Sequence, residues 1–213
     1  MTAVFNQLEG LMTLSPVIPV LTVENPEHAV PLAKALLAGG LKVLEITLRT
    51  QSALEVISRI ARDVPQAHVG AGTILSPSQI DDVARAGGSF CVSPGVTSGI
   101  IHTARDAGMK LLPGAITPSE VMNLLDQEIN YLKFFPAEAA GGIPMLKSFS
   151  APLAAARFCP TGGVRASTAG DYLALPNVLC VGGAWVCPAH MLASCDWGGI
   201  EQLARQASTL LDA

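Results

Sequence analysis

Charged residues, aromatic residues and basic segments are all scarce in this sequence. Charged residues make up 14% of the 213 residues, against about 25% in an average soluble protein, and aromatic residues make up 5%. The formal net charge is -4 and no basic block occurs, so we expect no nucleic-acid partner. A surface with so little charge favours burial of part of it between subunits.

Signals for disulfides, metal sites and secretion are also missing. The five cysteines are odd in number and include no C-x-x-C pair, which argues against a disulfide framework and a thiolate zinc site. The four histidines show no ligand spacing, so we expect no metal and no other cofactor, with a magnesium site made of carboxylates as the alternative. The N-terminus lacks a basic segment, and Pro16 and Pro19 interrupt the apolar run that follows. We therefore expect a cytoplasmic protein with no membrane span.

A two-part unit repeats along the chain. Apolar, β-branched runs end in Pro, Gly or Thr, and each is followed by a stretch with helical periodicity. Pairs such as Ser76-Pro77 and Thr117-Pro118 are typical of helix starts, because the hydroxyl caps free N–H groups and proline fits the first turn. The predicted strands are 17–21, 43–48, 67–71, 90–93, 110–113, 130–135, 157–160 and 178–181, and the helices begin near 26, 52, 77, 97, 118, 143, 166 and 200.

Eight such units in one unbroken chain predict a single (β/α)8 TIM barrel over residues 1–213. A short helix opens the chain, since Val4, Leu8, Leu11 and Met12 recur at helical spacing. A doubly wound open sheet is the alternative fold. A barrel carries its chemistry at the carboxyl ends of its strands, so the residues there are the candidates for a site.

The predicted strand at 130–135 holds a lysine among aromatic and apolar residues. Lys133 shares a strand face with Tyr131 and Phe135, and lysine is rarely buried without a reason. A desolvated amine loses its proton more easily, and a neutral amine forms Schiff bases with carbonyl compounds. The alternative is a structural lysine whose stem lies along the strand while its ammonium group reaches water or an ion-pair partner.

The second predicted strand carries polar residues on one face. Glu45, Thr47 and Arg49 alternate with apolar residues, so they should line the interior near the carboxyl end of the strand. A purely structural barrel layer would have Val, Ile or Leu at these positions. A buried structural ion pair between Glu45 and Arg49 is the alternative to a catalytic carboxylate.

Glycine pairs follow the last two predicted strands. They are Gly162-Gly163 and Gly182-Gly183, and they lie where barrels commonly bind phosphate. Glycine lets the backbone approach a ligand closely and direct N–H groups at it. Tight turns without a ligand are the alternative for these pairs, and also for the shorter motifs at 70–73 and 93–95.

Six stretches, in this order and spacing, resemble one known family. They are LEITLRT, VGAGT, SPG, KFFPAE, PTGG and VGGAW, and the resemblance to the 2-keto-3-deoxy-6-phosphogluconate (KDPG) and 4-hydroxy-2-oxoglutarate (KHG) aldolase family covers nearly the whole chain. The resemblance implies a class I aldolase of the Entner–Doudoroff pathway, a (β/α)8 barrel and a homotrimer. Its substrates would be a keto acid and a sugar phosphate: KDPG, cleaved to pyruvate and glyceraldehyde 3-phosphate, and also KHG, cleaved to pyruvate and glyoxylate.

The resemblance also implies roles for single residues. Lys133 resembles the Schiff-base residue and Glu45 the general acid/base. The residues that resemble the keto-acid pocket are Arg49, Thr73, Pro94, Phe135 and Thr161, and those that resemble the phosphate cradle are Gly162, Gly163, Gly183 and Ala184. The family usually has serine where this chain has Ala184, so the cradle lacks one hydroxyl donor, worth about 1 kcal/mol.

Other activities stay open on sequence grounds. An aldolase for the galactonate epimer differs in its substrate only at C4, and no residue here decides between the epimers. A metal-dependent aldolase would polarise the ketone with a divalent cation. A phosphate-binding isomerase or epimerase would keep both glycine pairs but would not need Lys133 opposite Glu45.

Overall fold

A computed structural model describes residues 8–211, and strands and helices alternate through them. The strands are β1 Val17–Leu21, β2 Val43–Thr47, β3 His68–Gly72, β4 Phe90–Val92, β5 Lys110–Leu112, β6 Tyr131–Phe134, β7 Arg157–Pro160 and β8 Val181–Gly183. The helices are α2 Leu8–Met12, the 3-10 helix η1 Pro26–His28, α3 Ala29–Ala38, α4 Ala53–Asp63, α5 Pro77–Arg85, α6 Ser98–Asp106, α7 Pro118–Leu125, α8 Gly142–Ser150, α9 Ala166–Leu173, α10 Ala189–Ala193 and α11 Trp197–Ser208.

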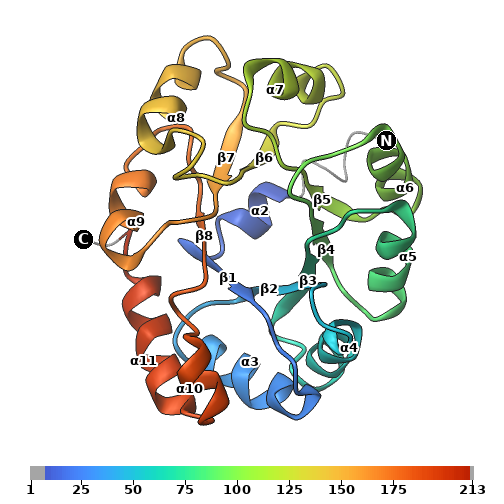
Figure 1. Cartoon of the computed structure of the whole chain (residues 1–213), viewed down its shortest axis with the longest axis vertical. Helices are drawn as coiled ribbons and strands as arrows, with labels where there is room; N and C mark the ends of the chain where they lie inside the picture. Colours follow the sequence, from blue (N-terminus) through green and yellow to red (C-terminus); the bar gives the residue numbers. More distant parts are fainter. Residues whose placement is uncertain (1–7, 212–213) are drawn as a thin grey trace.

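All strand pairs are parallel, and they form two sheets. Six strands follow the order β5-β4-β3-β2-β1-β8, and β6 pairs with β7 in the second sheet. Two isolated bridges connect the sheets. One joins Gly114, just after β5, to Lys133 in β6, and the other joins Thr161, just after β7, to Gly182 in β8. Figure 1 shows the longer helices outside the strands. The predicted α/β class with parallel strands is therefore confirmed.

The predicted capping residues begin several helices. Thr117 Oγ1 accepts from the Glu120 N–H at 3.3 Å, and the Glu120 carboxylate accepts from the Thr117 N–H at 2.9 Å. Ser76 and Gln79 form a second box of this kind at α5. Each box satisfies backbone donors that a helix start leaves free, so the chain turns into each helix just beyond the carboxyl end of a strand.

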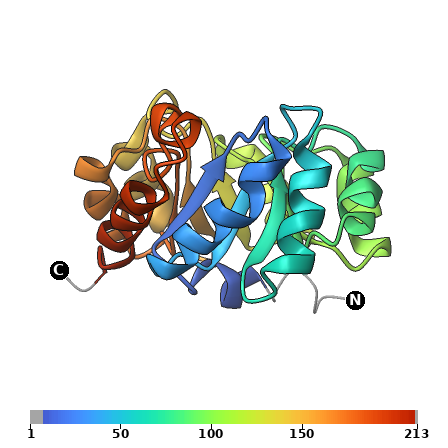
Figure 2. The ribbon, with the colours of Figure 1, turned by 90° about the horizontal axis from the view of Figure 1, so that it is seen from below.

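The short helix α2 covers the end of the molecule where the strands begin. Its residues Leu8, Leu11 and Met12 pack in one cluster with Ile18 and Phe90. Figure 1 shows α2 at the centre of the view, and Figure 2 shows it at the lower side, below the strands. The first part of the predicted opening helix, including Val4, lies outside the described residues. Since α2 covers the amino ends of the strands, their carboxyl ends remain for a site.

The last strand differs from its prediction. The sequence pattern places it at 178–181, whereas β8 runs from Val181 to Gly183 and includes both glycines. Gly182 and Gly183 pair with β1. A Cβ at Gly182 would overlap the Thr161 side chain, and a Cβ at Gly183 would overlap the Trp185 ring. These glycines therefore serve close packing within a strand, which apolar periodicity does not reveal.

The helix α10 was not predicted from the sequence. It is five residues long, which is too short for apolar periodicity to indicate a helix. Within residues 8–211, no helix is both long and apolar enough to cross a membrane.

Candidate active site

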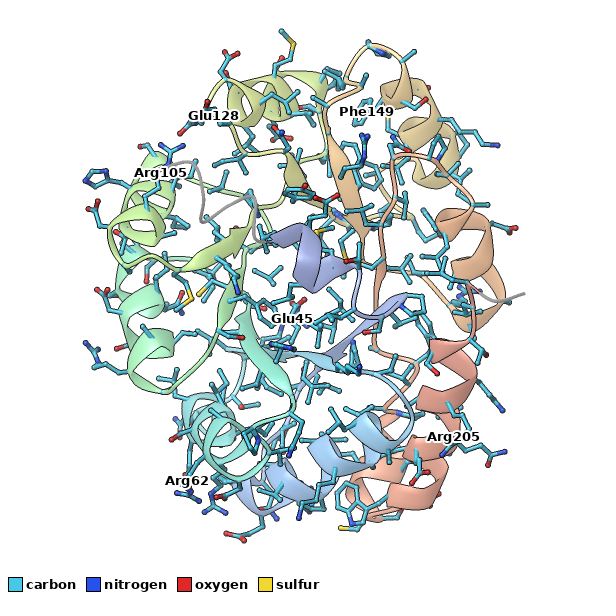
Figure 3. All side chains as sticks on the ribbon, turned by 180° about the vertical axis from the view of Figure 1, so that it is seen from behind. Glu45, Arg62, Arg105, Glu128, Phe149 and Arg205 are labelled. Atoms are coloured by element: carbon cyan, nitrogen blue, oxygen red, sulfur yellow. The ribbon has the colours of Figure 1, made fainter. Side chains whose placement is uncertain are left out.

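The strands β2 and β6 bring Glu45 and Lys133 together. Lys133 Nζ donates to Glu45 Oε1 at 3.3 Å, and the two residues are only 5% and 3% exposed. They are the only charged residues that are buried among residues 8–211. In Figure 3, Glu45 lies near the centre of the molecule, whereas the labelled Arg62, Arg105 and Arg205 lie on helices at its periphery. Among the described residues, the interior thus contains one buried ion pair within a largely apolar core.

Strand alternation places this ion pair in the interior. Leu44 and Ile46 on β2, and Leu132 and Phe134 on β6, belong to the large cluster that contains the helix residues. Side chains that alternate with them must point to the other side of each strand. Glu45 and Lys133 therefore face each other across the space that the strands surround.

A glycine on the neighbouring strand makes room for the carboxylate. Gly72 pairs with Thr47 in the β2–β3 register, and a Cβ at Gly72 would overlap the carboxylate of Glu45. From the sequence, the stretch at 70–73 is a possible turn, and no local pattern indicates this role of Gly72. The one general signal is that a glycine inside a strand often marks the close approach of another group.

The Cys180 thiol, which lies near Glu45, and the buried Cys91 thiol are both held in their neutral form. Cys159 lies beside Lys133 in the β6–β7 register. A hydrogen bond to Cys159, together with burial and the nearby Glu45 charge, raises the pKa of the Cys180 thiol well above its usual range. Burial alone raises the pKa of Cys91 to about 12. The Cys180 and Cys91 thiols therefore add no negative charge to the interior near neutral pH.

Lys133 lines a cavity of 220 Å³ at the carboxyl ends of the strands. Its Nζ lies 5.2 Å from the centroid of the Phe135 ring, which covers one side of the amine. The cavity brings together seven of the predicted site residues, namely Arg49, Lys133, Phe135, Thr161, Gly162, Gly163 and Ala184. Residues far apart in the sequence, from β2, β6, β7 and β8, thus meet in one place.

Arg49 lies at the mouth of the site. The predicted alternative, a buried ion pair between Arg49 and Glu45, is wrong, because Glu45 pairs with Lys133 and Arg49 is exposed. The Nε of Arg49 donates to Thr73 Oγ1 at 3.1 Å. Thr73 has a positive φ of 63°, which is uncommon for a β-branched residue. This contact holds the guanidinium group at the edge of the cavity, with its other donors available to a ligand.

Four predicted residues do not line this cavity, and one of them, Glu45, reaches it only through its ion pair with Lys133. Pro94 is half-buried, and its carbonyl lies so close to Gly114 that a Cβ there would overlap it. Thr73 reaches the site through Arg49. Gly183 is buried in β8 against the Trp185 ring. The sequence thus predicted that these residues lie near the ends of strands. Whether each residue lines the cavity depends on contacts between distant segments, which the sequence does not reveal.

The loop after β7 has the backbone geometry of a tight turn. Gly162 and Gly163 have φ values of 99° and 83°, which residues with a Cβ rarely adopt. The carbonyls of Thr161 and Gly162 accept from Ala137 and Glu138, at 2.8 Å and 3.0 Å. The loop after β6 therefore fixes the loop after β7.

Ala184 lies between two cavities. It lines the 220 Å³ cavity and also a second one of 560 Å³, which extends between the loop after β1 and α10. Val20 lines both cavities as well. Among residues 8–211, no group of three or more His, Cys, Asp or Glu side chains gathers as metal ligands would.

Known proteins resemble this chain over most of its length. A family model described as KDPG and KHG aldolase matches residues 8–203. The KHG/KDPG aldolase of Escherichia coli strain K12 is 48% identical over 199 residues, which is 93% of each chain. The KDPG aldolase of Legionella pneumophila, with pyruvate captured as a covalent carbinolamine, has a TM-score of 0.92 at 42% identity, over 94% of this chain and 97% of that chain. The KDPG aldolase of Zymomonas mobilis ZM4 with 3-phosphoglycerate has a TM-score of 0.92 at 46% identity, over 97% of both chains.

Proposed function

The chain belongs to the KDPG and KHG aldolase family, and on this premise we propose that it cleaves KDPG reversibly to pyruvate and glyceraldehyde 3-phosphate. The reaction follows a class I mechanism, with a Schiff base on an enzyme lysine, and serves the Entner–Doudoroff pathway. KHG, cleaved to pyruvate and glyoxylate, is a second substrate, since the Escherichia coli relative carries both names. The observation that carries the proposal is the buried Lys133 Nζ, 3.3 Å from Glu45 Oε1 and open to a cavity.

Lys133 forms the covalent intermediate. Its neutral amine attacks C2 of the keto acid to give a carbinolamine, and loss of water leaves an iminium on Nζ. Glu45 is close enough to accept and return the protons of these steps. In the relative from Legionella pneumophila, pyruvate is captured at the carbinolamine stage.

Glu45 then acts on the substrate. It removes the proton of the C4 hydroxyl, directly or through one water, and the C3–C4 bond breaks. The electron pair of that bond passes into the iminium, so the aldehyde leaves and the enamine of pyruvate remains on Lys133. Glu45 returns a proton to C3, and hydrolysis of the resulting imine frees pyruvate and the amine.

The residues around the ion pair bind the keto acid. Arg49, oriented by Thr73, pairs with the substrate carboxylate, because a guanidinium offers parallel donors that fit two oxygens. Phe135 and Thr161 line the cavity beside Lys133, and Pro94 follows the carboxyl end of β4 without lining the cavity itself. Together they fix the ketone carbon within reach of Nζ.

The loops after β7 and β8 bind the phosphate. Gly162 and Gly163 provide backbone N–H groups in a turn that glycine favours, and Ala184 lines the same cavity. Gly183 belongs to this cradle as the β8 residue that precedes Ala184, although its own contacts are with β1 and Trp185. Backbone donors suit a phosphate because its oxygens accept from several directions.

A single closed (β/α)8 barrel over residues 1–213 is the architecture that we propose for this site. The six-stranded and two-stranded sheets account for all eight strands. The bridges from Gly114 to Lys133 and from Thr161 to Gly182 lie where β5 would meet β6 and β7 would meet β8. Closure at both places would hold Glu45 opposite Lys133.

We also propose a homotrimer in the cytoplasm. The low charge content and exposed apolar residues such as Leu75 and Met122 support an oligomer, and the family resemblance specifies three subunits. All five cysteines are free, which fits a reducing compartment. Light scattering should give a particle of three chains at micromolar concentration, and a 22.0 kDa particle would contradict the trimer.

The test of the activity is pyruvate release from KDPG, coupled to lactate dehydrogenase, with and without EDTA. We expect turnover that EDTA does not reduce, and one borohydride-trapped pyruvate adduct per chain, which peptide mapping places on Lys133. The galactonate epimer and KHG serve as parallel substrates. Loss of activity in EDTA would favour the metal-dependent alternative, and an adduct on another lysine would show that the Schiff base does not form on Lys133.

A further inference from the structure

Glu138 ends the KFFPAE stretch, but the proposed chemistry gives it no role. It follows β6 in the loop that begins with Phe135, and it lies beside the loop after β7. Its backbone N–H donates to the carbonyl of Gly162 at 3.0 Å. Glu138 is therefore bound to the first glycine of the proposed phosphate cradle through its main chain.

The side-chain stem of Glu138 contacts the second glycine of the cradle. A Cβ at Gly163 would lie 2.7 Å from the Cβ of Glu138, and the Cγ of Glu138 is nearer still. The stem thus packs against the backbone of Gly163, where φ is 83°. A glycine is required at position 163 for two reasons, its backbone conformation and the presence of Glu138.

The carboxylate of Glu138 holds a buried tyrosine on α9. Tyr172 is 1% exposed, and its hydroxyl donates to Glu138 Oε1 at 2.8 Å. Burial and this hydrogen bond raise the pKa of Tyr172, so the hydroxyl remains a donor at any physiological pH. On another side the hydroxyl meets the start of α8, since a Cβ at Gly142 would lie 2.9 Å from it.

These three contacts fasten both ends of one segment. The segment begins at Gly162, passes through the cradle and enters α9, which carries Tyr172. The main chain and the side-chain stem of Glu138 contact the start of this segment, at Gly162 and Gly163. The Glu138 carboxylate accepts a hydrogen bond from Tyr172 in the helical part of the segment. The loop after β6, which follows Lys133, thereby fixes the position of the loop that would bind the phosphate.

We infer that Glu138 is a positioning residue for the phosphate cradle, acting through its hydrogen bond with Tyr172. The inference rests on the proposed function. The hydrogen bond from Tyr172 also keeps the Glu138 carboxylate turned towards α9. Without this bond the carboxylate could turn towards the cradle, where its negative charge would repel a phosphate. Glu138 therefore favours phosphorylated substrates such as KDPG over unphosphorylated ones such as KHG.

The experiment compares KM for KDPG with KM for KHG in two variants. Tyr172→Phe removes the hydroxyl, and Glu138→Ala removes the acceptor and the stem. Because one hydrogen bond is worth up to roughly tenfold in affinity, KM for KDPG should rise about three- to tenfold in each variant. KM for KHG should stay within about twofold of the parent enzyme, because KHG has no phosphate for the cradle to bind. The kcat values for both substrates should stay within the same range, because the chemical steps take place at Lys133 and Glu45.

Two further variants separate the hydrogen bond from charge and from stability. Glu138→Gln keeps an oxygen that accepts from Tyr172, so its ratio of the two KM values should match the parent enzyme. Asp171→Ala removes an exposed carboxylate from the same helix and should also leave the ratio unchanged. Melting temperatures, measured alongside, report any general loss of stability.

The outcomes distinguish the inference from the proposed function. A ratio that shifts in Tyr172→Phe and Glu138→Ala, but not in Glu138→Gln, supports the positioning role. Equal rises in KM for both substrates, or lower melting temperatures with an unchanged ratio, would overturn it. Failure of the parent enzyme to cleave KDPG or to form the pyruvate adduct would instead overturn the proposed function.

Discussion

The two halves of the site are built in different ways. Around β2 and β6 the site consists of two buried charged side chains, Glu45 and Lys133, whose reactive atoms lie 3.3 Å apart. Around the ends of β7 and β8 it consists of glycines and Ala184, which offer mainly backbone groups. In the first half two atoms carry the chemistry, whereas in the second several weak donors share the binding. We therefore expect substitutions to act on kcat in the first half and on KM in the second.

The largest effect is expected from substitutions of Lys133. Lys133→Ala removes the only proposed nucleophile, so both pyruvate trapping and cleavage should be abolished. It also leaves Glu45 buried without its partner, which should lower the free energy of unfolding by about 3–5 kcal/mol. Coupled pyruvate assays, borohydride trapping and chemical denaturation measure these effects.

Two variants separate lost chemistry from lost stability. Lys133→Arg keeps a cation beside Glu45 but cannot form an imine, because its guanidinium stays protonated. It should be folded and inactive. The double variant Lys133→Met/Glu45→Gln removes both charges and should recover stability without activity. Turnover in any of these variants would show that the Schiff base forms elsewhere.

Glu45→Gln comes next in size. The amide keeps the shape of the side chain but cannot take or return protons, so cleavage should fall by about 10²–10⁴-fold. Schiff-base formation with pyruvate should be slower but still present, because the nucleophile is intact. Single-turnover cleavage and the rate of borohydride trapping measure the two steps separately. Near-normal turnover would mean that another group is the acid/base.

Alternation along single strands explains why this half of the site could be predicted from the sequence. Lys133 among aromatic residues, and Glu45 opposite Leu44 and Ile46, already indicate two polar side chains in an apolar interior. Local patterns also predicted the helix starts at Ser76 and Thr117, since a capping hydroxyl residue followed directly by proline is typical of a helix start. The parallel α/β arrangement followed from the repetition of such units.

What the sequence left out depends on contacts between distant segments. The space that Gly72 gives to Glu45, and the bond from Tyr172 to Glu138, join residues that no local pattern connects. The β8 boundary was misplaced because Gly182 and Gly183 form strand pairs without apolar side chains. The exposure of Arg49 depends on where β2 ends, which alternation alone does not fix.

Gly72→Ala tests how closely the first half is fitted, with a smaller expected effect. Its new Cβ would overlap the Glu45 carboxylate and displace it. Since a misplacement of about 1 Å can cost roughly 10²-fold, kcat for KDPG should fall by up to this amount while Lys133 still forms the pyruvate adduct. Gly170→Ala on α9, where a Cβ meets nothing within 4 Å, is the matched control and should leave kcat unchanged. An unchanged kcat in Gly72→Ala would show that Glu45 can relocate without loss.

The smallest effect is expected in the second half, from Ala184→Ser. A serine here adds one hydroxyl donor to a cradle otherwise made of backbone N–H groups, and Ala184 is exposed to the cavity, so the hydroxyl can enter it. One hydrogen bond is worth about 1 kcal/mol, so KM for KDPG should fall by less than tenfold, with kcat unchanged. KM for KHG should hardly change, since that substrate has no phosphate. Steady-state kinetics with both substrates measure the difference.

Ala193→Ser is the control for this last prediction. Ala193 lines the larger cavity beside Ala184 but not the one that contains Lys133, so its hydroxyl should change neither KM. An equal gain for KDPG and KHG in Ala184→Ser would mean that position 184 does not face the phosphate. A gain confined to KDPG would show that a change in the second half alters KM without altering kcat. The reason is that the new hydroxyl adds one donor to several backbone N–H groups and does not touch the ion pair of the first half.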